Sequence, residues 1–383
     1  MALTAEAVGN IRARFPIFER KIYLNSCSQG ALSTTVEAGL LDFVVSWHQS
    51  GSPWDVWMQK YEQARAVFAR LIGAEPDEVA IVPSASAGIA GVASALGFDR
   101  RPKVVLGEFE FPTMGHVWLA QRPRGAQVQF VPAENNALPP AAYDRLIDDR
   151  TLIVPLTHVS FLNGFRSDVA AITRLAHERG ALLLLDGYQD CGTRPLDVKE
   201  LGVDFYVSGT LKYLLGPPGV AFLYVRRELA PSLAPAVTGW IGQANPFAFD
   251  LKRFDLGPGA RRFETGTPPI INLYGSIPGI ELLTGLGLDQ VSAQIAMLAH
   301  ALVEGTRRLC IRLKTPEATV GPLVVLQAQN LQALLARLDA RGIVASGRHD
   351  GLRISFHVYN TLGDVEQLLR VLQDNLDLLV REG

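Results

Sequence analysis

Short apolar runs alternate with amphipathic segments from about Val79 to Val225. Several of the intervening segments, such as 168–179 and 87–96, have the spacing of a helix. Runs that are apolar at nearly every position are typical of strands buried on both faces of a parallel sheet. The expected strands are Val79–Val82, Lys103–Leu106, Gln127–Val131, Leu152–Leu156, Ala181–Leu185, Phe205–Val207 and Val220–Val225. The pattern predicts an α/β fold with a mainly parallel, seven-stranded sheet and helices on both faces.

The alternating pattern ends near Val225. Residues 216–219 read GPPG, which predicts a tight turn and leaves open an antiparallel return of the strand that follows. Residues 226–270 are rich in proline, glycine and aromatic residues and have little periodicity. Because so long a loop is uncommon in a compact domain, we expect this segment to serve a site or an interface.

The last hundred residues predict a smaller α+β domain. The expected elements are helices at 273–285 and 289–309, a strand at 320–327, a helix at 330–341, a strand at 352–357 and a helix at 364–380. We therefore expect an N-terminal arm, residues 1–20, that packs with the small domain, a large domain over 21–285 and a small domain over 286–383. The boundary is expected inside a long connecting helix.

Composition narrows the class of protein. Of the 383 residues, 48% are hydrophobic and 19% are charged, which is typical of a compact globular chain. A net charge of −2 provides no basic field for nucleic acid or an anionic membrane. Residues 1–20 mix charged and apolar positions, unlike a signal peptide or a membrane span. Cys27, Cys191 and Cys310 are too scattered for a disulfide framework or a zinc site, so we expect no metal and a cytoplasmic location.

Lys212 is the first residue with suggestive surroundings. It follows the expected strand Phe205–Val207 and is flanked by apolar or small residues. Ser208, Gly209 and Thr210 could offer hydroxyls and a backbone amide to a phosphate. A lysine in an apolar setting has a lowered pKa, which suits Schiff-base formation. The alternative is a solvated loop lysine, the commonest fate of this residue type.

Asp186 ends the expected strand Ala181–Leu185, at the edge of an open α/β sheet where ligands bind. A carboxylate after four leucines needs a partner, and a protonated pyridine nitrogen would be one. A turn aspartate before Gly187 is an equal alternative. Asp186 and Lys212 are separated by one expected helix and one strand, which predicts that they face one cleft.

Six ordered motifs together resemble the class V aminotransferase family of fold-type I enzymes dependent on pyridoxal 5′-phosphate (PLP). That family includes cysteine desulfurases, selenocysteine lyases, isopenicillin N epimerase and kynureninase. The motifs are YLN at 23–25, SAS at 84–86, DGYQ at 186–189 with VDF at 203–205, Lys212 with GPPG at 216–219, RFETGTP at 262–268, and RISFHVYNT at 353–361. The resemblance implies a PLP cofactor, a fold-type I architecture and a homodimer with shared active sites.

The resemblance also implies a role for individual residues. Lys212 and Asp186 would be catalytic, Lys212 carrying the cofactor and Asp186 pairing its ring nitrogen. Arg353 and Asn25 would bind the substrate, Arg353 through its α-carboxylate. The other residues implied at the cofactor are Ser84, Ala85, Ser86, Phe111, Ser160, Gln189, Ser208, Thr210, Trp240 and Thr267.

Each of these residues also has an ordinary structural alternative. Ser84 could simply cap a helix, and Phe111 and Trp240 could be core or interface aromatics. Trp240 resembles a kynureninase tryptophan that reaches the phosphate, and Thr267 would reach the phosphate of a neighbouring subunit. The family residue after His-Val-Ser is usually asparagine, but this chain has Phe161 there, so Ser160 or Asn163 would take that contact.

The motifs imply the cofactor and leave the reaction open. With Lys212 as the base, the same residues serve transamination, β-elimination and racemisation of a small L-amino acid. Residues 342–352 contain no cysteine, which argues against the persulfide route of cysteine desulfurases. We therefore expect a transaminase or a desulfurase-like C–S β-lyase, with a kynureninase-like hydrolase or an epimerase as alternatives.

A PLP-binding protein without turnover would carry the same motifs. A nucleotide-binding α/β protein is disfavoured, because the chain has neither a Walker loop nor a G-x-G-x-x-G fingerprint.

Overall fold

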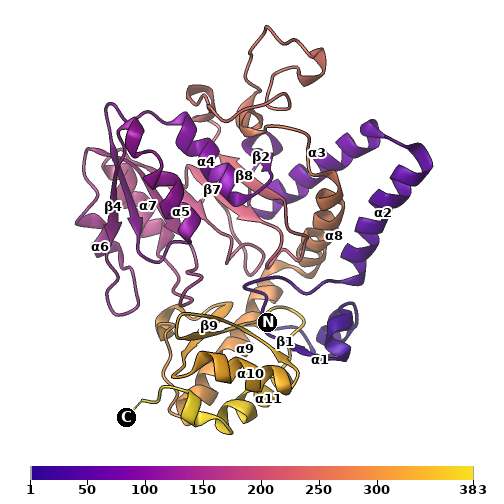
Figure 1. Ribbon diagram of the computed structural model, residues 1–383, viewed down its shortest axis with the longest axis vertical. Helices are drawn as coiled ribbons and strands as arrows, with labels where there is room; N and C mark the ends of the chain where they lie inside the picture. Colours follow the sequence, from indigo (N-terminus) through magenta and orange to yellow (C-terminus); the bar gives the residue numbers. More distant parts are fainter. Residues whose placement is uncertain (1, 383) are drawn as a thin grey trace.

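The computed structural model describes residues 2–382 and has two lobes, a large one built on the central sheet and a smaller C-terminal one (Figure 1). Within these residues the large lobe contains a seven-stranded sheet with the order β2-β8-β7-β6-β5-β3-β4. The strands are β2 (Val79–Val82), β3 (Lys103–Gly107), β4 (Gln127–Val131), β5 (Thr151–Thr157), β6 (Leu182–Asp186), β7 (Phe205–Gly209) and β8 (Ala221–Val225). All seven expected strands are present, within about two residues of their expected bounds.

The sheet is parallel except at β8, which is antiparallel to both of its neighbours, β2 and β7. The reversal follows from the turn at residues 216–219, where Gly219 has a φ of +92°. The hydroxyl of Thr210 donates to the carbonyl of Pro217 at 2.8 Å and closes the loop. The strand after this turn is therefore antiparallel to its neighbours, a direction that the sequence left open.

Helices cover both faces of the sheet, as expected. The helices of this lobe are α2 (Thr34–Ser50), α3 (Trp54–Leu71), α4 (Ala85–Ala95), α5 (Pro112–Leu119), α6 (Pro140–Asp144), α7 (Val169–Glu178) and α8 (Ile270–Leu286). Successive strand residues enter opposite cores: Leu183 and Leu185 pack with α3, α7 and α8, whereas Leu184 packs with α4 and α5. This alternation explains why the strands are apolar at nearly every position.

The C-terminal lobe has the expected alternation of helices and strands, with two additional short strands. Its elements are α9 (Leu288–Arg308), β9 (Leu323–Gln327), α10 (Leu331–Ala340), β10 (Ile343–Val344), β11 (Ser346–Arg348), β12 (Gly351–Ser355) and α11 (Leu362–Gln373). The additional strands are β10 and β11; β11 forms a hairpin with β12 and extends the antiparallel sheet of β12 and β9. The last helix is shorter than expected, because a 3-10 turn at Leu376–Leu378 follows it.

The connection between the lobes is bent. The two helices expected at 273–285 and 289–309 are present as α8 and α9, and they meet at an angle of 84°. The break lies at Gly287, whose φ of +81° is unfavourable for residues with a side chain. No single helix among the described residues is long and apolar enough to cross a membrane, and the bent pair α8–α9 passes the length and composition criteria only when taken together.

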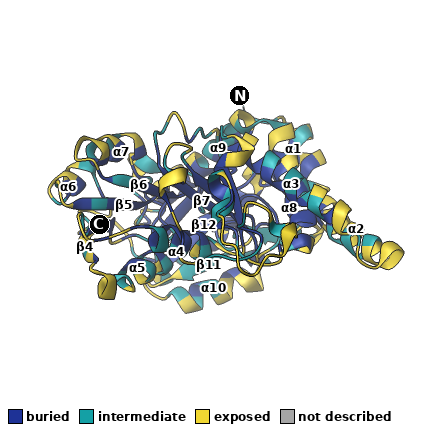
Figure 2. Ribbon diagram, turned by 90° about the horizontal axis from the view of Figure 1, so that it is seen from above, coloured by how far each residue is buried: buried dark blue, intermediate teal, exposed yellow. Residues whose placement is uncertain are grey.

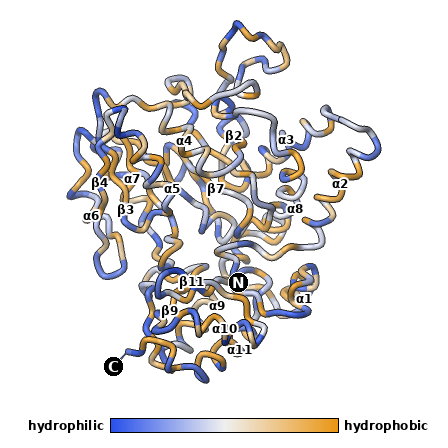
Figure 3. Tube along the Cα trace, viewed as in Figure 1, coloured by the Kyte–Doolittle hydropathy of each residue, from blue (hydrophilic) through white to orange (hydrophobic). Residues whose placement is uncertain are grey.

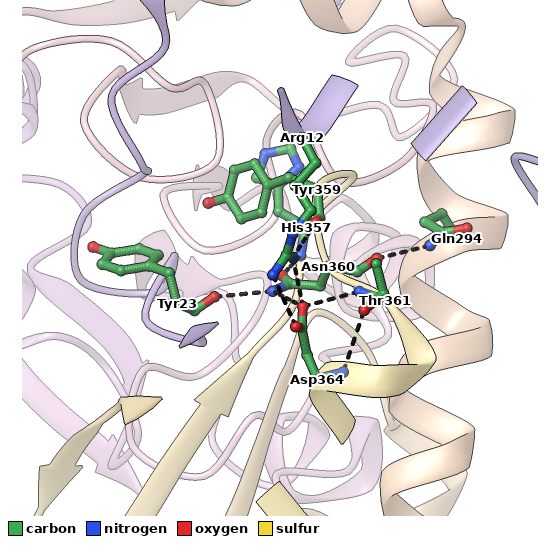
Figure 4. A network of polar contacts seen from close by, with 8 residues as sticks. All are labelled: Arg12, Tyr23, Gln294, His357, Tyr359, Asn360, Thr361 and Asp364. Atoms are coloured by element: carbon green, nitrogen blue, oxygen red, sulfur yellow. Dashed lines mark hydrogen bonds and ion pairs between the residues drawn. The ribbon is translucent and has the colours of Figure 1, made fainter. Parts of the chain in front are cut away.

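The N-terminal segment is fastened to the C-terminal lobe by a polar network (Figure 4). From α1 (Ala5–Arg12), Arg12 forms a two-pronged contact with Asp364 at 2.8 and 3.0 Å. The side chain of Asn360 donates to the carbonyl of Tyr23, in β1 (Ile22–Tyr23), which pairs in parallel with β10. Asn360 and Asp364 belong to or follow the YNT motif, so this motif ties the N-terminus to the strand that carries Arg353. These contacts support our proposed assignment of residues 1–20 to the small domain; the division near residue 285 likewise stays a proposal.

Two parts of the large lobe project from it. Helix α2 extends away from the body, and much of it is exposed (Figure 2). Its tip is hydrophilic, whereas apolar positions concentrate in the central elements (Figure 3). Residues 226–270 form irregular chain with short 3-10 turns, and part of this segment stands clear of the body at the top of Figure 1. It exposes large apolar side chains, with Phe249 76% and Leu251 96% exposed.

Candidate active site

A cavity of about 360 Å³ lies between the two lobes, at the ends of β5, β6 and β7. Thr157 and Asp186, the last residues of β5 and β6, line it together with the loop that follows β7. This is the edge of an open α/β sheet at which ligands generally bind. Among the residues proposed from the sequence, the structure brings together Ser84, Ala85, Ser86, Phe111, Asp186, Gln189, Lys212 and Arg353 around this cavity.

Lys212 lies in a loop that is held on both sides. The amide of Gly30 donates to the carbonyl of Leu211 at 2.7 Å, and the imidazole of His357 contacts the carbonyl of Tyr213 at 2.8 Å. A Cβ at Gly30 would lie 2.4 Å from the carbonyl oxygen of Lys212, so this close approach requires glycine. The N-terminal segment and the YNT strand thus both position the lysine.

The amine of Lys212 sits between two aromatic rings. Its Nζ lies 4.5 Å from the centre of the Tyr188 ring and 5.9 Å from that of Phe111. Burial lowers the pKa of Lys212 to about 8, although the nearby Asp186 carboxylate opposes this shift. A lysine with this pKa is partly neutral near physiological pH, so it can act as a nucleophile and as a base.

Asp186 is a buried carboxylate, and one of its two oxygens already accepts a hydrogen bond. Its Oδ1 accepts a hydrogen bond from the amide of Tyr188 at 2.8 Å. Burial raises the pKa of Asp186, and the Tyr188 amide and Lys212 act in the opposite direction. The turn after Asp186 needs glycine, because a Cβ at Gly187 would lie 2.1 Å from the hydroxyl oxygen of Tyr206. The carboxylate is thereby aimed into the cavity and has the capacity for one further partner.

The N-terminus of α4 forms another wall. Ser84 is the N-cap, and its hydroxyl accepts from the amide of Ala87 at 3.1 Å. The first amides of a helix have no partner within the helix and favour an anion. The hydroxyls of Ser86 and Thr113 lie 3.1 Å apart at the same place. The capping role of Ser84 and a phosphate-binding role for this helix end are therefore compatible.

Arg353 and Gln189 place unpartnered polar atoms in the buried wall. Arg353 is 2% exposed, and its Nη2 donates to the hydroxyls of Ser28 and Ser346 at 2.8 and 2.9 Å. Its Nε has no hydrogen-bond partner among the described residues. Gln189 donates to the carbonyl of Cys27 at 3.0 Å, which leaves its Oε1 without a partner in the same part of the chain. Since buried polar atoms are normally satisfied, both atoms are available to a ligand or a water molecule in the cavity.

Four of the proposed residues lie outside the cavity wall. The hydroxyl of Ser160 accepts from the amides of Leu162 and Asn163 at 3.2 and 3.4 Å and so stabilises a turn. The remaining three are Asn25, which bridges to Ser355; Ser208, which is fully buried; and Thr210, which closes the loop after β7.

Trp240 and Thr267 also lie away from this cavity. The indole of Trp240 packs 6.0 Å from the rings of both Phe247 and Phe249, in the projecting segment. Thr267 is exposed. Neither residue is among those that line the cavity.

The RFETGTP motif is anchored by a buried ion pair. Glu264 contacts Arg65 at 2.5 Å, and both side chains are 1% exposed. The same oxygen accepts from the amide of Ile81 in β2 at 2.9 Å. The motif is thus fastened to helix α3 and to the sheet, which explains its glutamate in structural terms.

Several residues of the cavity wall were not predicted from the sequence. Tyr188 and Arg348 were not singled out, although Tyr188 lies inside the DGYQ motif. Ser28 also enters from the N-terminal segment, and Phe161 contacts Phe111 edge-on at 5.0 Å between ring centres. The motif letters around Tyr188 could have indicated it, but no local signal marks Arg348.

Comparison with known proteins gives a consistent family. The profile described as "Aminotransferase class-V" matches residues 48–368. An uncharacterized aminotransferase of Bacillus subtilis, YcbU, is 36% identical over 91% of this chain and 93% of its own length. A kynureninase of Pseudomonas fluorescens is 27% identical over 98% of this chain and 94% of its own.

Solved structures show the same fold. The apo cysteine desulfurase of Thermococcus onnurineus has a TM-score of 0.88 at 24% identity and covers 98% of this chain and all of its own. A variant of C-DES with glycine covalently linked to its PLP cofactor also has a TM-score of 0.88, at 22% identity, covering 95% and 99% of the two chains. The architecture is therefore that of fold-type I enzymes, as the sequence predicted.

Proposed function

This chain belongs to the class V aminotransferase family of PLP-dependent enzymes, and on that premise we propose that it holds PLP on Lys212 and transaminates a small L-amino acid. The observation that carries the proposal is the amine of Lys212. It lies in an enclosed cavity with a pKa of about 8, opposite an arginine suited to a carboxylate.

The residues of the cavity fit this cofactor. Asp186 offers a buried carboxylate to a protonated ring nitrogen, and the N-terminus of α4 offers amides and hydroxyls to a phosphate. The unpartnered Oε1 of Gln189 and the flat ring of Phe111 lie in the same wall. These features support Lys212, Asp186, Ser84, Ala85, Ser86, Phe111 and Gln189 as the cofactor site.

When bound, PLP withdraws electrons from the Cα of an attached amino acid and so makes its proton acidic. Lys212 then supplies the base: its lowered pKa leaves part of the amine neutral, and that nitrogen takes and returns the proton. Asp186 would pair its carboxylate with the protonated ring nitrogen. Arg353 would orient the substrate through its α-carboxylate, held by Ser28 and Ser346 in a fixed position. Phe111 and Tyr188 flank the amine.

Transamination is favoured over the other outcomes by two observations. The relative with 36% identity is described as an aminotransferase. The segment before Arg353, residues 342–352, contains no cysteine. Lys212 is therefore placed to move a proton without a second nucleophile in that segment.

The test is spectroscopic. Purified protein loaded with PLP should absorb near the edge of the visible range, and borohydride should fix the cofactor onto Lys212 but not onto a Lys212→Ala variant. Mixing with single amino acids should convert the cofactor to its pyridoxamine form and release the matching keto acid. A protein that cannot be loaded with PLP would contradict the proposal.

A second candidate is β-elimination from a sulfur amino acid, and the position of Cys27 favours it. Its thiol lines the cavity and lies 3.8 Å from the hydroxyl of Ser346, in the hairpin before Arg353. A thiol is thus present near the substrate end of the site although the hairpin lacks one. Formation of sulfide, pyruvate and ammonia from cysteine, or of cysteine persulfide, pyruvate and ammonia from cystine, with loss of these products in Cys27→Ser, would select this reaction. Kynureninase-like hydrolysis and epimerisation stay alternatives of the same cofactor chemistry.

We also propose a homodimer in which Trp240 and Thr267 contribute to the partner's cofactor site. The exposed apolar side chains of residues 237–254 and the exposed hydroxyl of Thr267 support this arrangement. A cytoplasmic location is proposed from the three scattered cysteines, which form no disulfide in the described chain.

A further inference from the structure

The hairpin of β11 and β12 presents two arginines to the same cavity. Ser346 is paired directly with Arg353, and Arg348 with Gly351. Residues directly opposite each other in an antiparallel pair lie on one face, and so do residues two apart along a strand. Arg348 therefore lies on the face that carries Arg353, and both line the cavity with Lys212.

Arg348 has no acidic partner within residues 2–382. Its Nη1 donates to the carbonyl of Gly347 at 2.8 Å, which is its own neighbour in the chain. The nearest carboxylate in sequence, Asp350, is occupied by Lys314 and by Gln327, whose Nε2 donates to it at 2.9 Å. Gly351 opposite Arg348 has no side chain that could block it. The guanidinium is therefore exposed and free to turn over the cavity.

The proposed reaction gives a role to the other charged groups of the cavity wall but none to Arg348. Arg353 would bind the α-carboxylate, Asp186 the ring nitrogen, and the N-terminus of α4 the phosphate. Lys212 would carry the cofactor. Arg348 is then the remaining cation of the cavity wall. A guanidinium beside a partly enclosed cavity favours a planar anion, which it can bind through two hydrogen bonds.

We propose that Arg348 binds an anionic group at the end of the substrate side chain. The substrate class would then be short amino dicarboxylates, such as aspartate and glutamate, and their sulfinate analogues. Phe111 and Phe161, whose rings meet edge-on, also line the cavity, and its volume of about 360 Å³ favours a short side chain. The inference rests on the proposed function and adds the identity of the substrate class.

The test is a titration of the PLP-loaded protein in which the cofactor spectrum reports binding. The amino acids are used in pairs of one anionic and one neutral side chain: aspartate with asparagine, glutamate with glutamine, and cysteine sulfinate with alanine. We expect the anionic member of each pair to bind more tightly. Arg348→Gln should weaken binding of the anionic members about 10- to 100-fold, the range for a hydrogen-bonded charge, while alanine serves as the internal reference. Arg348→Lys should restore part of the preference.

Arg337→Gln is the matched control, because Arg337 is an exposed arginine of α10 outside the cavity. Calorimetry with succinate and butyrate provides a readout that does not depend on turnover: succinate should bind more tightly, and Arg348→Gln should remove the difference. Equal weakening of all amino acids in Arg348→Gln would show that Arg348 shares the α-carboxylate and would overturn the inference. Equal binding of aspartate and asparagine to the unmodified protein would overturn the inference about Arg348 and leave the proposed function intact. A spectrum that no amino acid perturbs would overturn the proposed function as well.

Discussion

Glu110 accepts a hydrogen bond from the amide of Thr157 at 2.9 Å, and Thr157 is the direct sheet partner of Asp186. The other oxygen of Glu110 is buried and has no partner among residues 2–382. Burial raises the pKa of Glu110 from 4.5 to about 8, and the Asp186 carboxylate adds to the shift. A largely neutral acid at pH 7 thus lies close to Asp186, the residue proposed for the ring nitrogen.

This relationship predicts a pH dependence of stability. Because the pKa of Glu110 is raised on folding, its contribution is present in full below pH 4.5 and is lost as the pH rises through about 8. Over that interval the free energy of unfolding should fall by up to about 1.4 kcal/mol per pH unit from this group. Glu110→Gln should remove that slope in urea unfolding of cofactor-free protein between pH 5 and 8. The exposed Glu108→Gln is the control and should keep the wild-type slope.

The second prediction concerns cofactor capture by Lys212. A neutral amine is needed to attack the aldehyde of PLP, so the rate of loading should rise with pH and level off above about 8, the pKa of Lys212. Asp186 raises that pKa, so Asp186→Asn should move the midpoint to lower pH. Stopped-flow absorbance of cofactor-free protein mixed with PLP between pH 6 and 10 measures both midpoints. A midpoint near 10.5, the ordinary lysine value, would refute this view.

The buried pair of Arg65 and Glu264 should be important for stability. Glu264→Leu leaves the guanidinium of Arg65 buried with one partner fewer, which should destabilise the protein by about 3–5 kcal/mol. The exposed pair of Arg307 and Glu304 offers the control: Glu304→Leu should change the stability by less than about 1 kcal/mol. Urea unfolding of both variants measures the difference, and similar losses in the two would contradict the role assigned to the buried pair.

The three cysteines should differ in reactivity. Cys310 is exposed and should react at once with a thiol reagent. Burial raises the pKa of Cys191 to about 12, so this thiol should stay inert at pH 8 until the protein unfolds. Cys27 lines the cavity and should react slowly, and more slowly still when PLP is bound. Mass spectrometry of labelled peptides assigns each rate; rapid labelling of Cys191 would show that its surroundings open readily.

The last prediction tests the homodimer. Phe249 and Leu251 expose most of their surface in the projecting segment. If a second copy covers them, replacing both by aspartate should lower the mass in solution to that of one chain and weaken PLP binding. Light scattering after size-exclusion chromatography and the spectral titration measure these effects. The same double change in a protein that is already monomeric would leave both measurements unaltered.

Local sequence patterns were sufficient to predict the central sheet and the two central residues of the candidate site, Asp186 and Lys212. The strands β2 to β8 are apolar at nearly every position, because residues from each strand enter both cores. Asp186 and Lys212 were recognisable because Asp186 ends one such strand and Lys212 lies in the loop after the next, at the edge where ligands bind. Helices α2 and α3 were not identified, and α2 in particular projects from the body with few buried positions, so its apolar periodicity is weak.

Tertiary structure alone decided which side chains share the cavity. Arg348 shares a face with Arg353 only through the register of a short hairpin, and Cys27 meets Ser346 across more than three hundred residues. Glu110 lies behind Asp186 only because β3 and β5 are neighbours in the sheet. Hydrophobic periodicity and turn residues act over a few positions, whereas ionisation and ion pairing depend on burial by distant segments. The sequence therefore indicated the cofactor and its lysine, and the packing of the two lobes supplied the arginine from which we infer the substrate.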